Sequence, residues 1–337
     1  MQVFASLDPE LPLAAVADEA RRLEALGVDG IHVPETIHDS LAVALLAVEH
    51  TSRVTVRTAV TLAFVRSPTL VAYTAWDLAQ LSGGRFELGL GSQVKQNVEG
   101  RFGMPWSEPT ARMREYVEAL RALFAAFASG EPVAYEGESY RITRLQPYFN
   151  PGPSTVGPPP VWLGAVNPRM CAVAGALADG VVTHPTNASP DYLAEVVVPA
   201  LRDSAAAAGR PVPRLVAATT VATGVDDEAV ARDRERQRRL LAFLYSTPPY
   251  KATLERQGWP DLQPRLQSLV REDRWDDLGS VLDDEVLDQL LVCGRYDELP
   301  TLLRDRYAAV AHGVVIRAPA GRADDAALAA AVEQLRS

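Results

Sequence analysis

His184 is the side chain in this sequence that best suits proton transfer at neutral pH, because a free imidazole has a pKa of about 6.5. It directly follows Gly180–Val182, a short apolar run that is typical of a β-strand. Glu35 follows a similar run, Gly30–Val33, and a carboxylate there could act as a general base or cap the next helix. A histidine that only completes a hydrogen bond in the core is the alternative for His184, so the sequence leaves both roles open.

Glycines after another apolar run indicate a place where the backbone could approach an anion. Residues 82–93 read SGGRFELGLGSQ, so a short strand runs into Gly91, Ser92 and Gln93. The N–H groups of such a turn have no side chain in front of them. A dinucleotide-binding fingerprint is incomplete, because Val94 stands where its third glycine belongs. The turn is therefore either a tight connection from strand to helix or a ligand cradle.

A matching loop is expected after the apolar run 161–164. There Ala165, Val166 and Asn167 precede Pro168, whose fixed φ suits the first turn of a helix. Free N–H groups at the start of a helix, with the positive end of the helix dipole behind them, make a good phosphate site. The alternative is that Asn167 simply caps the helix. This loop and the glycine turn could hold one phosphate between them.

Short β-type runs alternate with helical patterns through the chain, in the order that a (β/α)8 barrel requires. We therefore predict an α/β fold, a TIM-like barrel in a single domain over residues 1–337, with insertions at about 91–109, 131–160 and 226–290. An open, doubly wound sheet with a helical cap is the alternative. In a barrel the carboxyl ends of the strands share one mouth, so the polar residues at these ends would line one pocket.

Composition excludes several classes of protein. The formal charge is −10 and no block of lysine and arginine occurs, which argues against nucleic acid or an anionic membrane as a partner. The first residues do not resemble a signal peptide and no stretch is long enough to span a membrane, so we predict a cytoplasmic protein. Cys171 and Cys293 lie far apart, and His32 and His38 have no partners at metal-ligand spacing. We therefore predict neither a disulfide nor a metal site.

Several short motifs carry a family resemblance when they are taken together. They are Thr58-Ala59-Val60-Thr61, Arg66-Ser67-Pro68, Leu81-Ser82-Gly83-Gly84-Arg85-Phe86, Leu88-Gly89-Leu90-Gly91-Ser92, Phe102-Gly103 and Ala178-Asp179-Gly180-Val181. In this combination the chain resembles the luciferase-like monooxygenase superfamily, and within it the oxidoreductases that use the deazaflavin coenzyme F420. The resemblance covers residues 1 to about 184 well and residues 294–319 weakly.

The resemblance implies a barrel with insertions and a homodimer formed through helices of the N-terminal half. It also implies that the third strand ends in a bulge whose non-prolyl cis peptide backs the deazaflavin ring, and this bulge falls at Ala59-Val60. Coenzyme contacts are implied for three short segments. These are Ala59, Val60 and Thr61; Gly91, Ser92 and Gln93; and Ala165, Val166 and Asn167.

The chemistry that the resemblance implies is hydride transfer between the deazaflavin and a small organic substrate, while a side chain gives or takes a proton. The sugar-phosphate dehydrogenases of this family carry an Asp-His pair where this chain has Glu35-Thr36, so their histidine chemistry does not transfer. We hypothesise instead that His184 delivers the proton and that Glu35 shapes the pocket. Thr36, Phe64 and Trp106 would contact a partly hydrophobic substrate, or the two rings only pack the core. A monooxygenase that uses reduced FMN, and a barrel that binds a coenzyme without catalysis, are the alternatives.

Overall fold

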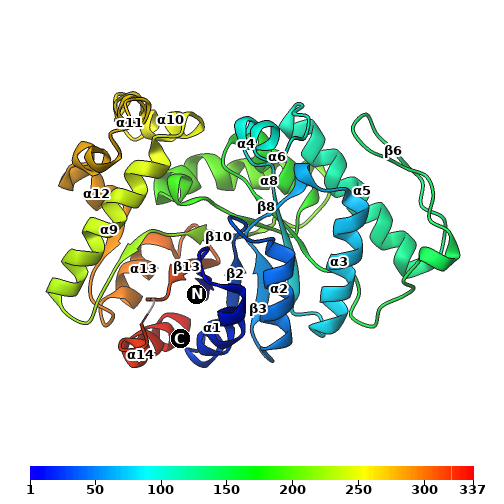
Figure 1. The fold of residues 1–337 in the computed structure, drawn as a ribbon, viewed down its shortest axis with the longest axis horizontal. Coiled ribbons are helices and arrows are strands. Elements are labelled where there is room, and N and C mark those ends of the chain that lie inside the picture. Colours follow the sequence, from blue (N-terminus) through cyan, green and yellow to red (C-terminus); the bar gives the residue numbers. More distant parts are fainter. Residues whose placement is uncertain (320) are drawn as a thin grey trace. The chain divides into compact units, whose positions relative to one another are not determined.

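A computed structural model of the chain describes residues 1–319 and 321–337 (Figure 1). Its main sheet is a closed barrel of parallel strands surrounded by helices, so the predicted TIM-like barrel is confirmed. The barrel strands are β1 (Gln2–Ser6), β2 (Gly30–Val33), β3 (Thr55–Thr58), β4 (Thr61–Leu62), β5 (Phe86–Gly91), β8 (Val161–Gly164), β9 (Gly180–Val182), β10 (Arg214–Ala218) and β13 (Gly313–Arg317). Their order is β3-β2-β1-β13-β10-β9-β8-β5-β4, and β3 also pairs with β5. Because β3 and β4 both pair with β5, they share one strand position of the barrel.

Helices follow the strands along the chain, as the alternating pattern predicts. They are α1 (Leu13–Ala25), α2 (Ser40–Glu49), α3 (Pro68–Leu81), α4 (Lys95–Gly100), α5 (Pro109–Ser129), α6 (Pro168–Leu177), α7 (Pro190–Tyr192), α8 (Val198–Ala207), α9 (Asp227–Tyr245), α10 (Lys251–Arg256), α11 (Leu262–Arg271), α12 (Asp284–Leu290), α13 (Leu299–Tyr307) and α14 (Asp325–Arg336). Within the described residues, no helix is both long enough and apolar enough to cross a bilayer.

The residues form two compact units, which we describe separately. The amino-terminal unit comprises residues 4–182 and 199–215. The carboxyl-terminal unit comprises residues 1–3, 183–198 and 216–337.

A buried arginine and its partners fill the interior of the strands in the amino-terminal unit. Arg57 on β3 donates to Nε2 of His32 (2.9 Å) and forms an ion pair with Glu87 on β5. Its guanidinium lies over the rings of Phe4 (4.5 Å) and Trp162 (3.3 Å). Burial lowers the pKa of Arg57 to about 10 despite the opposing effect of Glu87, and burial also holds the pKa of His32 well below its ordinary value. The interior is therefore a packed core that contains a neutral histidine beside a paired cation.

Helix α3 begins and helix α5 ends at the residues that local signals indicate. The Ser67 side chain accepts from the Thr69 N–H (3.2 Å), and Pro68 occupies the first turn of α3. Helix α5 ends at Gly130, whose φ of 76° is a left-handed conformation that glycine adopts without strain. These caps fix the two helices whose packing covers one side of the strands.

The predicted insertions at 91–109 and 131–160 contain small elements. The first includes α4, a short helix that the sequence did not indicate. The second begins with an antiparallel hairpin of β6 (Tyr135–Glu136) and β7 (Arg141–Ile142). A proline-rich connection then leads to β8.

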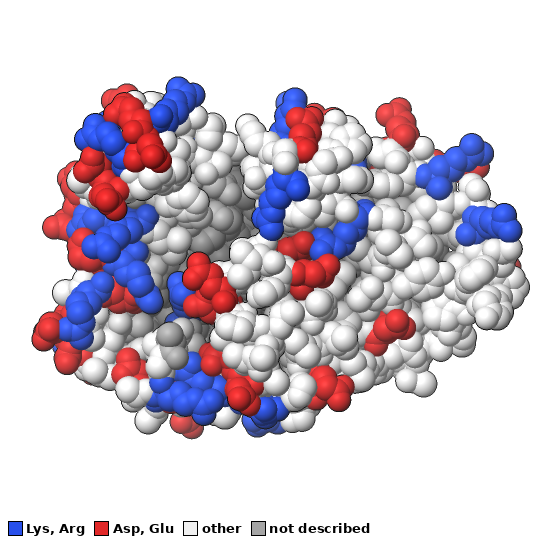
Figure 2. Space-filling view, viewed as in Figure 1, with Lys and Arg blue, Asp and Glu red and all other residues white. Residues whose placement is uncertain are grey.

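The segment predicted as the third insertion, residues 226–290, builds a hydrophobic core of its own inside the carboxyl-terminal unit. Helices α9 to α12 and a small parallel pair, β11 (Val221–Ala222) and β12 (Val292–Cys293), contribute to it. Its buried members are Ala222, Leu241, Ala242, Tyr245, Leu254, Leu262, Leu266, Leu278, Val281, Leu282, Val286, Leu287, Leu290 and Leu291. Acidic and basic side chains crowd the outer surface over α9, α11 and α12 (Figure 2).

Candidate active site

A bulge at Ala59 and Val60 interrupts the strand position formed by β3 and β4. The peptide bond between these two residues is cis, as the family resemblance implied. The Thr58 hydroxyl donates to the Gly89 carbonyl (2.8 Å) and accepts from the Gly89 N–H (2.9 Å), so a side chain replaces strand pairing there. On the other side, the Ala59 N–H donates to the Val33 carbonyl (2.7 Å). Hydrogen bonds to both neighbouring strands therefore hold the bulge.

Two glycines leave the space that the Val60 side chain occupies. A Cβ atom added to Gly91 would lie 2.3 Å from Val60 Cγ2, and one added to Gly164 would lie 3.2 Å from Val60 Cγ1. Because the first distance is far shorter than carbon atoms tolerate, residue 91 has to be glycine while valine stands at 60. Gly91 thus has a packing role that the sequence alone did not indicate.

Glu35 has an almost fully buried carboxylate, with 5% of its side chain exposed, and its partners surround the bulge. One oxygen, Oε1, lies 2.7 Å from the Arg66 guanidinium. The other, Oε2, accepts from the Ser40 hydroxyl (2.9 Å) and from the Leu62 N–H (3.0 Å). Ser40 in turn lies 2.8 Å from the Thr61 hydroxyl. A carboxylate so fully partnered holds β4 in place, and these contacts favour the pocket-shaping role over that of a general base.

Arg66 is shared between Glu35 and a second carboxylate. It pairs with Asp39 Oδ2 (2.7 Å) and donates to the Leu62 carbonyl (3.3 Å). Burial acts to lower the pKa of Arg66, but the two carboxylates outweigh burial and raise that pKa above its ordinary value. Burial likewise acts to raise the pKa of Asp39, yet the hydrogen bond and charge of Arg66 hold that pKa below its ordinary value. Arg66 and Asp39 are therefore both ionised at neutral pH.

The turn after β5 contains backbone N–H groups that could serve as donors to a ligand, one of the two alternatives that the sequence left open. Gln93 has a φ of 61°, an uncommon left-handed conformation for a residue other than glycine. Its side-chain oxygen accepts from the Val94 N–H (2.8 Å). In the part of the chain that the structure describes, the N–H groups of Ser92 and Gln93 donate to no protein atom.

The loop after β8 has the helix cap that the sequence offered as one alternative. The Asn167 side chain accepts from the Met170 N–H (3.0 Å) at the start of α6. Ala165 is buried and Val166 is half-buried in the same loop. Strands β5 and β8 are direct neighbours in register, so their two loops leave the sheet side by side. The cap and the neighbouring turn are both compatible with an anion held by backbone N–H groups.

The residues predicted to contact substrate lie in differing surroundings. Phe64 is fully buried, and the Arg112 guanidinium lies 4.5 Å from its ring centroid. The rings of Phe64 and Trp106 meet edge to face, with centroids 5.9 Å apart. Thr36 donates to the Pro9 carbonyl (3.2 Å). In this arrangement Phe64 packs the core, which is the alternative that the sequence left open for the aromatic residues.

His184 belongs to the carboxyl-terminal unit, where its ring is fixed from two sides. It caps the short helical turn Pro185–Asn187, with Nδ1 2.8 Å from the Thr186 hydroxyl and accepting from the Thr186 N–H (3.3 Å). Its ring stacks on Tyr250 with centroids 4.9 Å apart and an interplanar angle of 8°. Because Nδ1 acts as the acceptor, the proton of the neutral ring resides on Nε2.

Burial lowers the pKa of His184 to about 4. The imidazole is therefore neutral at pH 7, and its Nε2–H can donate a hydrogen bond. Delivery of a proton from an imidazolium, as the sequence suggested, would be confined to acidic solution.

The structure gathers most of the predicted site around one bulge and its neighbouring loops. All predicted residues except His184 belong to the amino-terminal unit. Sequence reasoning missed Thr58, Ser40 and Arg66 as residues that hold the bulge. A buried carboxylate at 35 requires a cation and further donors, and that requirement was the one signal that could have indicated Arg66.

Comparison with known proteins places this geometry in context. The family model for luciferase-like monooxygenase matches residues 1–313. An uncharacterized protein of Mycobacterium tuberculosis is 41% identical over 313 residues, covering 92% of both chains. A 5,10-methylenetetrahydromethanopterin reductase of Archaeoglobus fulgidus is 29% identical over 262 residues, covering 76% of this chain and 74% of that protein.

Two solved structures share the fold. The coenzyme F420-dependent tetrahydromethanopterin reductase from Methanopyrus kandleri matches with a TM-score of 0.82 and 20% identity, covering 99% of this chain and 98% of that chain. The oxygenating constituent of 3,6-diketocamphane monooxygenase from Pseudomonas putida, in complex with FMN, matches with a TM-score of 0.71 and 15% identity, covering 99% and 96%.

Proposed function

The chain belongs to the luciferase-like monooxygenase family and is an oxidoreductase, and we propose that its coenzyme is F420 and its substrate a small organic molecule. The relatives and structural neighbours named for F420 support this coenzyme. Reduced or oxidised deazaflavin supplies the hydride chemistry when it is bound. The protein has to orient the coenzyme, exclude water and place a polar group at the reacting oxygen of the substrate.

We assign the coenzyme to the bulge and the two neighbouring loops of the amino-terminal unit. The observation that carries the assignment is the set of free N–H groups on Ser92 and Gln93, next to the capped start of α6. Such donors suit the phosphate of a coenzyme tail. The bulge residues 59–61 would then support the ring, and the buried Glu35 cluster would hold them still.

Coenzyme binding can be measured directly. The purified protein is titrated with F420 and, separately, with FMN, and each titration is followed by the fluorescence of the ligand. We expect F420 to bind more tightly than FMN. Gly91→Ala should weaken F420 binding at least about tenfold, because the added methyl group displaces Val60 from the bulge. Gly100→Ala is the matched control, since a Cβ there meets nothing within 4 Å. Tight binding of FMN without binding of F420 would contradict the assignment.

For His184 we propose a hydrogen bond from Nε2–H to the substrate oxygen whose bond order changes during hydride transfer. A neutral imidazole with its second nitrogen already occupied is suited to this role. His184→Ala should abolish reduction of F420 by a panel of alcohols, aldehydes and sugar phosphates while F420 binding survives. The rate should also show no His184-dependent inflection near pH 6.5, because the ring stays neutral down to about pH 4. Retained turnover in the variant would exclude the role.

An FMN-dependent monooxygenase is the second candidate, and the FMN complex among the structural neighbours favours keeping it. Consumption of oxygen with reduced FMN, but not with reduced F420, would select this candidate.

We also propose a homodimer formed through α2 and α3. These helices are apolar almost all round, and their exposed faces carry Leu45, Leu70 and Leu81, which are 46%, 66% and 50% exposed. A helix of this kind is normally buried. The predicted cytoplasmic location stays a prediction.

A further inference from the structure

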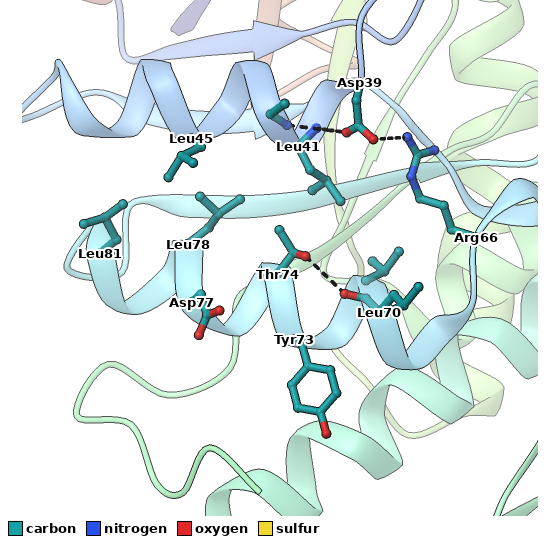
Figure 3. A pocket seen from close by; sticks show the side chains of 12 residues that line it. Asp39, Leu41, Leu45, Arg66, Leu70, Tyr73, Thr74, Asp77, Leu78 and Leu81 are labelled. Atoms are coloured by element: carbon teal, nitrogen blue, oxygen red, sulfur yellow. Dashed lines mark hydrogen bonds and ion pairs between the residues drawn. The ribbon is translucent and has the colours of Figure 1, made fainter. Parts of the chain in front are cut away.

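A groove on the outside of the amino-terminal unit separates α2 from α3. It has a volume of about 660 Å³, and leucine side chains from the two helices point into it (Figure 3). Most of its lining is apolar. The lining residues are Asp39, Leu41, Ala42, Leu45, Arg66, Leu70, Val71, Tyr73, Thr74, Asp77, Leu78 and Leu81.

Arg66 and Asp39 close one end of this groove. In Figure 3 the guanidinium and the carboxylate face each other there, and their 2.7 Å ion pair is drawn. Asp39 Oδ1 meanwhile accepts from the Leu41 N–H (2.8 Å) and so caps α2. The two oxygens of this carboxylate thus have separate tasks, one toward the helix and one toward Arg66.

The same guanidinium also reaches the bulge. It contacts Glu35 Oε1 (2.7 Å) and the Leu62 carbonyl (3.3 Å), and Glu35 Oε2 accepts from the Leu62 N–H (3.0 Å). Leu62 follows Thr61, one of the residues assigned to the coenzyme. One side chain, only 18% exposed, therefore bridges the end of the outer groove and the strand that carries the bulge.

We propose that Arg66 is a positioning residue that couples occupation of the groove by a second copy of this chain to coenzyme binding at the bulge. The inference rests on the proposed function and deepens it, because it links the dimer contact to the coenzyme site. A partner that packs against the end of the groove restricts the positions of the Asp39 and Arg66 side chains. Through its contacts with Glu35 and the Leu62 carbonyl, Arg66 then restricts the position of β4. Coenzyme binding fixes the same residues from the other side.

The charges of the groove favour a second copy as the occupant. The chain carries a net charge of −10, so two copies repel each other unless they meet where charge is scarce or paired. In this groove Arg66 is already neutralised by its two carboxylates, and Asp77 is the remaining charged residue of the lining. The surface formed by α2 and α3 contains both the groove and exposed leucine side chains. In a two-fold symmetric dimer, the leucines of each copy could therefore pack into the groove of the other.

Coupling between two sites is reciprocal in free energy. If the dimer tightens F420 binding, F420 has to tighten the dimer by the same factor. Typical couplings of this kind amount to about fivefold or more. The factor can be measured without any substrate, and it is separate from the affinity of either site.

The experiment compares three proteins. Mass photometry over a dilution series gives the dimer dissociation constant with and without saturating F420, and exchange of fluorescently labelled subunits extends the range if the dimer is tight. For the wild-type protein, saturating F420 should lower the dimer dissociation constant at least about fivefold. Asp39→Asn should lose this factor, because asparagine keeps the helix cap but cannot accept from Arg66 with its amide nitrogen. Asp77→Asn removes the same charge from the groove without touching Arg66, and should keep the factor whatever it does to the dimer affinity.

Each outcome decides the matter. A wild-type dimer that F420 does not tighten overturns the coupling, as does an Asp39→Asn dimer that tightens as wild type does. A protein that stays monomeric yet binds F420 overturns the coupling and leaves the coenzyme assignment standing. A protein that does not bind F420 at all overturns both. Circular dichroism melting of each variant shows whether a lost factor merely reflects unfolding.

Discussion

Two groups of helices differ in how much of their apolar surface is buried: α2 and α3 on the one hand, and α9 to α12 on the other. In α2 and α3 the charged residues are Glu49 and Asp77, and the side chains of Leu45, Leu70 and Leu81 remain exposed. The apolar sides of α9 to α12 are buried against one another in a separate core. Their outer sides carry ion pairs, such as those of Arg234 with Asp284 and Asp288. The difference teaches that charge, more than hydrophobicity, marks the surface that faces water. The helices that carry few charges, α2 and α3, are the ones for which we propose a partner.

The largest expected effect is on stability. Leu241→Ala removes a fully buried side chain from the core of α9 to α12, and should lower the free energy of unfolding by about 2–5 kcal/mol. Leu45→Ala on α2 should change the stability of the monomer by no more than about 0.5 kcal/mol, because that side chain is half exposed. Urea unfolding, with hydrogen exchange of α9, measures both. Equal losses would erase the contrast between the two regions.

The next effect is on association. Leu70→Glu places a charge in the proposed contact and should weaken the dimer at least about a hundredfold, since a buried unpaired charge costs several kcal/mol. Leu240→Glu on α9 changes an exposed leucine to the same residue and should leave the dimer unchanged. Sedimentation velocity of the two variants gives the answer. A dimer that survives Leu70→Glu would place the contact elsewhere.

A smaller effect is expected for the ion pairs of α9. Arg234→Gln loses the contacts with Asp284 (3.2 Å) and Asp288 (2.7 Å), but both carboxylates are exposed. The melting temperature should fall by no more than about 3 °C, and 0.5 M NaCl should narrow the difference from wild type. Differential scanning fluorimetry at two salt concentrations tests this. A large drop would mean that these pairs hold the insertion together.

The smallest effect concerns pH. The pKa of Asp39 lies below its ordinary value, so its pair with Arg66 persists above about pH 4 and is lost only as pH falls through that lowered pKa. The coupling factor between F420 and the dimer should therefore change less than about twofold from pH 8 to pH 5. Mass photometry at three pH values checks it. A loss between pH 7 and pH 6 would point to a histidine in place of Asp39.

Local sequence patterns were sufficient for the barrel but not for its broken strand, which only the family resemblance indicated. Alternating apolar runs and the Asn167-Pro168 start of α6 depend on neighbours in the chain, and the sequence indicated both. The division of one strand into β3 and β4 depends on the Thr58 hydroxyl meeting Gly89 across the sheet. A contact between residues so far apart in sequence has no local pattern. Helix α4 was missed because its six residues are too few for a periodic signal.

The candidate site shows the same limit. Residue type was enough to select Glu35 and His184, but their partners decide what they can do. Glu35 is occupied by Arg66 and by a backbone N–H, and His184 is neutral because it is buried. Neither burial nor a distant partner can be inferred from residue type alone, so roles were harder to predict than positions.

The Val60 side chain packs between Gly91 and Gly164, so the residue tolerated at either glycine position depends on the residue at position 60. A methyl group at 91 collides with Val60 Cγ2, yet it would lie 3.4 Å from Val60 Cβ once the valine is shortened to alanine. Gly91→Ala is therefore harmful alone and tolerable after Val60→Ala. The effects of substitutions at positions 60 and 91 therefore depend on each other, and libraries that vary this loop should randomise the two codons jointly.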